Sequence, residues 1–116
     1  MPVIAKDIVE QLLAFRKERD WEPFHTPKNL SAALSVEAAE LLECFQWAKD
    51  SELSELVVRE RTAIEEEVAD IAIYLCYLCH DLNIELDVAV RSKLEKNRQK
   101  YPVSLARGTA TKHDRL

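Results

Sequence analysis

The chain has 116 residues, of which 47% are hydrophobic and 32% charged, with one Gly, four Pro and a net charge of −5. This length predicts a single domain over residues 1–116, and the scarcity of Gly favours long helices over a turn-rich β fold. The acidic balance argues against nucleic acid or an anionic membrane surface as the main partner.

The sequence shows no sign of membrane insertion or secretion. No apolar run approaches the roughly 20 residues that a membrane span needs, and the N-terminal residues lack the apolar core of a signal peptide. Cys44, Cys76 and Cys79 make an odd number of cysteines, all within helical patterns. Free thiols in a reducing compartment fit this usage better than a disulfide framework, so we expect a cytoplasmic protein.

The first predicted helix covers residues 4 to about 19, where Ile8, Leu12 and Phe15 recur at helical spacing. A loop follows at residues 21–25, because Pro23 biases the residue before it out of the helical region. The loop holds two aromatic residues and a histidine, which is unusual material for a simple connector.

A second helix is predicted to begin at Thr26 and Pro27, a hydroxyl cap followed by proline at the first helical position, and to end near residue 48. A third is predicted to begin somewhere within 54–60 and to end near Leu82, before Asn83.

The fourth predicted helix covers residues 86 to about 101 and is stopped by Pro102. Residues 103–116 are predicted to form an extended or mobile tail. The sequence therefore predicts an all-α bundle of four main helices. A chain of this size can bury a core of its own, and a partner subunit would cover the apolar helix faces that remain.

Two pairs of carboxylates, each three residues apart, lie in the second and third predicted helices. Glu37 and Glu40 form the first pair, and Glu67 and Asp70 form the second. Residues i and i+3 share one face of a helix, and Glu37 and Glu67 each fall inside the apolar stripe of their helix. Four acids brought together by packed helices repel one another unless a cation lies between them. Oxygen ligands of this kind suit Mg²⁺, with Mn²⁺ as a substitute.

Other interpretations of these residues are weaker. An exposed acidic face is the usual fate of helical Glu, but it does not explain two inner carboxylates within apolar stripes. A diiron bundle needs Glu-x-x-His on two helices, and neither pair contains His. The segment from Cys76 to His80 matches the C-x-x-C-H pattern of haem attachment, but it lies in mid-helix and offers too few ligands for a structural zinc site.

Aromatic residues suggest where an organic ligand would bind. Trp21, Phe24 and His25 gather in one loop, although His25 is also compatible with an ordinary loop histidine. Trp47 follows Glu40 on the second predicted helix, where it suits either the core or stacking on a nucleobase.

Basic residues recur along the fourth predicted helix. Lys93, Asn97 and Lys100 lie near one face, at positions i, i+4 and i+7. A solvated basic face is one interpretation. The other is a phosphate clamp, because Lys supplies point charge and Asn adds neutral donors.

Together these residues make the chain resemble the MazG-like, all-α nucleotide pyrophosphohydrolases, whose signature is E-x-x-E followed after a gap by E-x-x-D. The resemblance is greatest to the dCTP pyrophosphatase branch of that family. Four segments carry it and cover nearly the whole chain: Arg19–Leu30, Glu40–Trp47, Asp70–Leu75 and Ser92–Pro102.

The resemblance implies a Mg²⁺ site formed by Glu37, Glu40, Glu67 and Asp70. It implies that a set of mostly aromatic residues holds the base and sugar: Trp21, Phe24, His25, Asn29, Trp47 and Tyr74. The phosphates are expected to meet basic and amide residues, often from a neighbouring subunit: Lys93, Asn97 and Lys100. The family also implies a homodimeric unit, usually paired into a tetramer. Where the branch can place a base-facing His in the first helix, this chain has Leu12, which leaves the base preference open.

We therefore predict a Mg²⁺-dependent house-cleaning enzyme that converts a deoxynucleoside triphosphate, dCTP or a related pyrimidine, to its monophosphate and pyrophosphate. Glu40 or Glu43 would accept the proton of the attacking water, with Glu40 favoured by its place nearer the stripe edge. Two alternatives remain at this point. One is a pyrophosphohydrolase for dUTP or phosphoribosyl-ATP, and the other is a non-catalytic helical dimerisation module.

Overall fold

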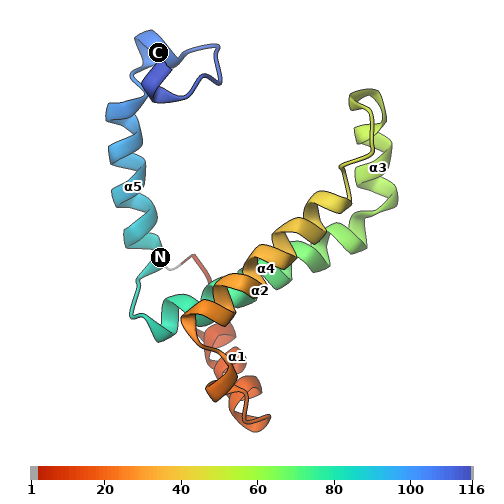
Figure 1. The fold of residues 1–116 in the computed structure, drawn as a ribbon, viewed down its shortest axis with the longest axis vertical. Coiled ribbons are helices and arrows are strands. Elements are labelled where there is room, and N and C mark those ends of the chain that lie inside the picture. The colour runs from red at the N-terminus through yellow and green to blue at the C-terminus, as the bar shows by residue number, and fades with distance from the viewer. Residues whose placement is uncertain (1–2, 116) are drawn as a thin grey trace. The chain divides into compact units, whose positions relative to one another are not determined.

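The computed structural model describes residues 3–115, and no strand occurs among them, which confirms the all-α prediction. Residues 4–84 form one compact unit, and residues 85–115 belong to a second unit that is described by itself. Figure 1 shows the helices of both units. Their bounds are α1 Lys6–Glu18, α2 Pro27–Glu43, α3 Leu53–Arg59, α4 Arg61–Asp81, α5 Leu86–Lys100 and α6 Val103–Ala106.

Helix α1 ends in a motif that fixes the direction of the following loop. The backbone N–H of Trp21 donates to the Arg16 carbonyl at 3.2 Å, and that of Asp20 donates to the Lys17 carbonyl at 3.0 Å. Asp20 adopts a φ of 52°, so these bonds form the Schellman motif with Asp in the left-handed position. The chain then enters a short 3₁₀ turn, η1, Glu22–Phe24.

Helix α2 begins as predicted but ends earlier. The Thr26 hydroxyl accepts a hydrogen bond from the Asn29 backbone N–H at 3.1 Å, and Pro27 occupies the first helical position. The helix ends at Glu43 rather than near residue 48, because the next residues tighten into turns. The N–H of Cys44, for example, donates to the Leu41 carbonyl three residues back at 3.1 Å.

The single long helix predicted for the middle of the chain is divided in two. Helices α3 and α4 meet at Glu60, whose φ of −100° and ψ of 21° break the helical path, and a 3₁₀ turn, η2, Asp50–Glu52, precedes α3. Neither Gly nor Pro marks this break in the sequence. The C-terminal end of α4 lies where predicted, and Asn83, with a φ of 54°, occupies the left-handed position of a second Schellman motif.

The core of residues 4–84 lies where α2 packs along α4, and α1 and α3 contact α4 elsewhere. Figure 1 shows α2 (orange to yellow) lying beside α4 (green). The most deeply buried apolar residues are few: Leu30, Leu56, Cys76, Tyr77 and Cys79. Many apolar side chains stay exposed in the single chain, among them Val36, Leu42 and Val68. Burial by a second copy remains a prediction.

The second unit contains α5, α6 and a final 3₁₀ turn, η3, His113–Arg115. Helix α5 ends at Lys100, just before the predicted stop at Pro102. Beyond it, in the segment predicted to be extended, α6 forms one helical turn, and the Tyr101 ring meets the His113 ring edge-on with centroids 5.7 Å apart.

Candidate metal and nucleotide site

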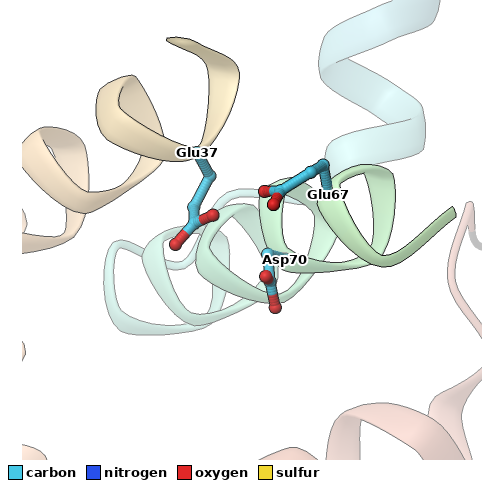
Figure 2. A group of neighbouring side chains, drawn as sticks. All are labelled: Glu37, Glu67 and Asp70. Carbon is cyan, nitrogen blue, oxygen red and sulfur yellow. The ribbon is translucent and has the colours of Figure 1, made fainter. Parts of the chain in front are cut away.

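Three carboxylates converge where α2 faces α4. Ligand oxygens of Glu37 on α2 and of Glu67 and Asp70 on α4 all lie within 4.8 Å of one another, and all three residues are half-buried. Figure 2 shows the Glu37 side chain pointing from α2 toward the two acids of α4. The i, i+3 spacing of Glu67 and Asp70 places both on the same face of their helix.

The cluster contains carboxylate oxygens that the protein leaves unpaired. One oxygen each of Glu37 and Glu67, the Oε2 atom, is buried and has no hydrogen-bond partner within residues 3–115. The neighbouring carboxyl of Glu40, followed by burial and by Glu67, raises the pKa of Glu37 to about 7. Burial is the largest cause of the raised pKa of Glu67. Buried carboxylate oxygens are normally stabilised by a cation or a hydrogen-bond donor, and these oxygens have neither within the described residues.

The other two acids considered from the sequence differ from each other. Glu40 is half-buried and lies outside the group of three, but its carboxyl is close enough to dominate the pKa of Glu37. Glu43 is exposed at the last position of α2. Of the two, Glu40 has the closer electrostatic connection to the cluster.

The donor set suits a hard divalent cation. Such cations prefer carboxylate oxygens, and Mg²⁺ is usually bound by only a few protein carboxylates with its remaining positions left for water or phosphate. A cation here would contact the unpaired oxygens of Glu37 and Glu67 and would offset both the burial and the repulsion that raise their pKa values. The residues present therefore fit a metal ion.

A cleft of about 460 Å³ adjoins the acidic cluster within residues 4–84. Asp70 belongs to both, since it also lines the cleft. Each of two helices contributes residues at i, i+3, i+4 and i+7: Ile8, Gln11, Leu12 and Phe15 from α1, and Asp70, Ile73, Tyr74 and Tyr77 from α4. One helical face from each side thus forms a largely apolar and aromatic wall.

The loop predicted to hold a base supplies the rest of the lining. Trp21 and His25 both line the cleft, and their ring centroids lie 6.1 Å apart. The His25 ring also packs against Tyr77, with centroids 5.1 Å apart. Burial, together with the nearby charge of Arg16, lowers the pKa of His25, so the imidazole is neutral at pH 7. An aromatic, uncharged surface of this kind is suited to a planar ring.

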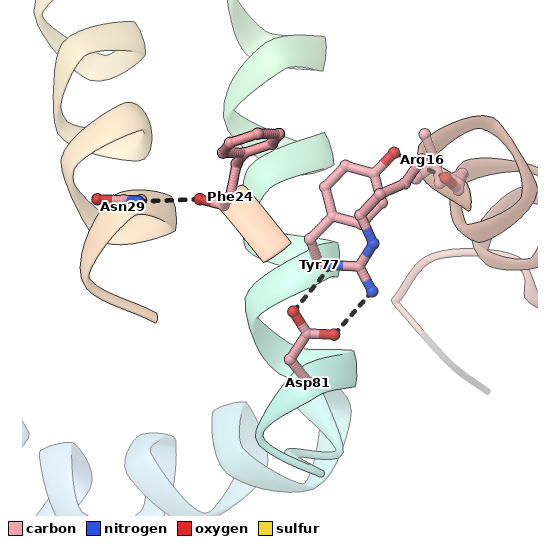
Figure 3. Close-up of polar contacts among 6 residues, drawn as sticks. Arg16, Phe24, Asn29, Tyr77 and Asp81 are labelled. Carbon is pink, nitrogen blue, oxygen red and sulfur yellow. Dashed lines mark hydrogen bonds and ion pairs between the residues drawn. The ribbon is translucent and has the colours of Figure 1, made fainter. Parts of the chain in front are cut away.

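A partly buried ion pair, which the sequence did not predict, joins α1 to α4 beside the cleft. Arg16, only 6% exposed, donates from both Nη atoms to the two Asp81 oxygens at 2.8 Å each. Its guanidinium also lies 4.7 Å from the centre of the Tyr77 ring, and the Tyr77 hydroxyl donates to the Leu12 carbonyl at 2.7 Å. Figure 3 shows this arrangement of Arg16, Tyr77 and Asp81.

Three of the residues predicted to hold the base and sugar lie outside the cleft lining. Phe24 is 68% exposed, and Asn29 instead donates from its side-chain amide to the Phe24 carbonyl at 2.9 Å, which ties the loop to α2 (Figure 3). Trp47 is 86% exposed in the turns after α2. The structure brings Trp21, His25 and Tyr74 together at the cleft, but not Phe24, Asn29 and Trp47.

The basic residues of the prediction belong to the second unit. Lys93, Asn97 and Lys100 lie on α5, where Asn97 is half-buried and the two lysines are exposed. The charge of Lys100 is the main reason why the pKa of Lys93 is lowered, so the two ammonium groups lie near each other. An anion between them would relieve this repulsion.

Comparisons with known proteins place the chain in a family. Residues 32–116 match the model of the MazG-like family. The chain is 45% identical over 113 residues to mouse (Mus musculus) dCTP pyrophosphatase 1 and 43% identical over 113 residues to the human (Homo sapiens) protein of that name. Each alignment covers 96% of this chain and 66% of the relative, so the chain spans just under two thirds of their length.

A solved structure is similar as well. The crystal structure of a pyrophosphatase from Archaeoglobus fulgidus superimposes with a TM-score of 0.81 at 45% sequence identity. The match covers 84% of this chain and 91% of that chain.

Proposed function

The chain belongs to the MazG-like family, and from that premise we propose that it is a metal-dependent nucleoside triphosphate pyrophosphohydrolase. It would convert a deoxynucleoside triphosphate to the monophosphate and pyrophosphate, and so remove surplus or modified nucleotides. One observation carries the proposal: Asp70 belongs both to a carboxylate cluster with orphaned oxygens and to an aromatic cleft. The acidic cluster, as the metal site, and the cleft, as the base site, would therefore share Asp70.

Glu37, Glu67 and Asp70, with Glu40 beside them, would hold Mg²⁺ or, as a substitute, Mn²⁺. When bound, the cation supplies positive charge that offsets the charge of a triphosphate and favours ionisation of a water molecule nearby. The unpaired oxygens of Glu37 and Glu67 support this assignment, because the chain offers them no other partner among the described residues.

The cleft would hold the base and sugar. Trp21, Tyr74 and the neutral His25 present ring faces and edges on which a nucleobase can pack. Because Asp70 lies at the border of the cleft and the cluster, a bound base would leave its phosphates directed toward the acids. Glu40, with Glu43 as the second candidate, would take the proton from the attacking water.

The phosphates would be met by the basic face of α5. Lys93, Asn97 and Lys100 would supply charge and an amide donor to the leaving pyrophosphate, from a neighbouring subunit in a dimer or a dimer of dimers. The mutual repulsion of Lys93 and Lys100 supports a role in anion binding. We propose that this homo-oligomer is cytoplasmic, because the three cysteines are free thiols, as in a reducing compartment. As a separate finding, none of the helices within residues 3–115 has the length and hydropathy of a membrane span.

The names of the relatives favour dCTP, or a related or modified pyrimidine nucleotide, as the substrate. The cleft itself does not distinguish dCTP from dUTP, and phosphoribosyl-ATP is the other nucleotide considered. A non-catalytic dimerisation module is the remaining alternative. The unpaired oxygens of Glu37 and Glu67 argue against that module, because buried acids that repel one another would destabilise a protein that binds no cation.

The test is hydrolysis of the four deoxynucleoside triphosphates, dUTP and phosphoribosyl-ATP by the purified chain with Mg²⁺. Pyrophosphate and orthophosphate are scored separately, and a parallel reaction contains excess chelator. We expect pyrophosphate release that needs the metal and is fastest with dCTP. Orthophosphate release would contradict the proposed bond cleavage. Absence of turnover, together with no change in melting temperature on adding Mg²⁺ or nucleotide, would favour the dimerisation module.

A further inference from the structure

Gln11 is the polar exception on an otherwise apolar face of α1. The other residues that α1 contributes to the cleft are Ile8, Leu12 and Phe15. Gln11 occupies the i+3 position of that set, so its side chain lies on the same face of the helix as its apolar neighbours. Gln11 is exposed as well as part of the cleft lining, so its side chain is accessible to a ligand that enters the cleft.

The Gln11 carboxamide has both hydrogen-bonding groups available. In the part of the chain that the structure describes, its side chain takes part in no hydrogen bond. Among the other polar groups of the lining, the Tyr77 hydroxyl donates to the Leu12 carbonyl at 2.7 Å, and Asp70 belongs to the acidic cluster. The Tyr74 hydroxyl and the buried Nδ1 of His25 form no hydrogen bond within residues 3–115 either, but neither group carries both a donor and an acceptor on a flexible side chain as Gln11 does. Gln11 therefore offers a donor and an acceptor that the fold does not use.

We propose that Gln11 is a specificity-determining residue, whose carboxamide hydrogen-bonds to the edge of the nucleobase held in the cleft. This inference rests on the proposed function. A base packed on aromatic rings exposes its donors and acceptors at its edge, and in an apolar pocket those groups need partners. A carboxamide can pair with two adjacent edge atoms at once, which gives discrimination as well as affinity.

The experiment compares Gln11→Leu with Gln11→Glu. Leucine keeps the approximate size and removes both hydrogen-bonding groups, whereas glutamate keeps acceptors and removes the donor. Glu10→Leu serves as the matched control, since Glu10 is exposed on the same helix and lies outside the cleft lining. For each protein, kcat and KM are measured for the four deoxynucleoside triphosphates and dUTP with Mg²⁺.

We expect Gln11→Leu to lower kcat/KM for the preferred triphosphate about tenfold, mainly through KM, while poorer substrates change little. The ratio between the best and second-best base should fall by a similar factor. Gln11→Glu should change the order of preference toward bases whose edge donates hydrogen bonds. Glu10→Leu should leave all ratios unchanged. An equal loss for every base, or no loss, would overturn the role of Gln11.

A binding measurement separates this inference from the proposed function. Affinities of the wild type and Gln11→Leu for the five deoxynucleoside monophosphates are measured by calorimetry, without turnover. If the wild type binds one base selectively and Gln11→Leu loses that selectivity, the inference stands even where no pyrophosphate is released. If pyrophosphate is released but Gln11→Leu keeps the wild-type selectivity, the inference is wrong and the proposed function stands. Absence of both turnover and binding would overturn both.

Discussion

Helix α4 carries carboxylates in two opposite conditions. At its C-terminal end, both oxygens of Asp81 accept hydrogen bonds from Arg16, and this pairing lowers the pKa of Asp81 below its ordinary value. Earlier on the same helix, Glu67 has a buried oxygen without a partner within residues 3–115, and burial raises its pKa. Its neighbour across the helix pair, Glu37, has a pKa of about 7.

The paired Asp81 stabilises the fold, whereas the unpaired acids of the cluster destabilise it. The ion pair of Asp81 joins α1 to α4 and helps to hold the cleft walls together. The acidic cluster does the opposite, because like charges around unpaired oxygens oppose the packing of α2 on α4. Local conflicts of this kind are expected where a protein binds a ligand, since the ligand resolves them. Four changes test the contrast.

The largest expected effect follows from neutralising the acid shared by the cluster and the cleft. Asp70→Asn should lower kcat/KM for the preferred triphosphate by more than about 100-fold, because residues that merely support metal ligands already cost about 10- to 100-fold when removed. Glu66→Gln is the matched control, an exposed acid on the same helix that should keep near-normal activity. Near-normal activity in Asp70→Asn would show that the metal site is elsewhere.

The response of stability to Mg²⁺ is the next largest effect. A ligand that binds only the folded state at 100 times its dissociation constant stabilises that state by about 2.7 kcal/mol, so the melting temperature of the wild type should rise with Mg²⁺. Glu37→Gln should lose most of this rise. Without metal, however, it should be at least as stable as the wild type, because the amide removes one of the repelling charges. Thermal denaturation with and without the ion measures both effects, and a large loss of stability without metal would mean that Glu37 is part of the structural framework.

Asp81→Asn should give the reverse pattern. It leaves the charge of the buried Arg16 uncompensated and should cost about 2 kcal/mol of unfolding free energy at pH 7. This lies below the 3–5 kcal/mol of a fully buried pair, since the Asp81 side chain keeps 25% exposure. The rise in melting temperature with Mg²⁺ should survive. Urea denaturation measures the loss, and an unchanged midpoint would show that the pair is not stabilising.

The same variant predicts a pH dependence. The folded-state pKa of Asp81 is lowered by the Arg16 hydrogen bonds, so the folded protein binds this proton more weakly than the unfolded chain does. The stability from the pair is therefore present above the ordinary Asp pKa and is lost as the pH falls through the lowered value. The difference between the wild type and Asp81→Asn should shrink below about pH 4. A difference that stays constant down to pH 2 would contradict this linkage.

The sequence predicts the cluster better than the cleft, for a physical reason. The i, i+3 spacing of Glu67 and Asp70 is local, and helix geometry alone places both on one face. The cleft depends on pairing between residues far apart in sequence, as when Arg16 meets Asp81 across 65 residues. Helical periodicity identifies the apolar stripe of α1 but does not say which helix it faces. The sequence did not indicate a role for Gln11, because a single polar residue within an apolar stripe is common.

The ends of the helices are likewise predictable only where a local sequence signal marks them. The start of α2 is marked by Thr26 and Pro27, two residues with strong local preferences, and it was predicted correctly. The early end of α2 after Glu43 carries no Gly or Pro signal, so periodicity alone extended that helix too far. The break at Glu60 has no such signal either, and the sequence therefore left the start of the third helix open within 54–60. The exposure of Trp47 follows from that early end, because the residue lies in turns rather than on a packed helix.

The smallest expected effect concerns the neutral hydrogen bond beside the ion pair. Tyr77→Phe removes the hydroxyl that donates to the Leu12 carbonyl at 2.7 Å but keeps the ring beneath Arg16. It should cost about 1 kcal/mol in unfolding free energy, the typical net value of such a bond and less than the loss in Asp81→Asn. Tyr74→Phe is the matched control, because the Tyr74 hydroxyl forms no hydrogen bond inside the described chain and its loss should leave stability unchanged. If Tyr77→Phe lowered the unfolding free energy as much as Asp81→Asn does, the charge of Asp81 would not be the main attachment of α1 to α4. The paired acid would then have no larger structural role than a neutral hydrogen bond.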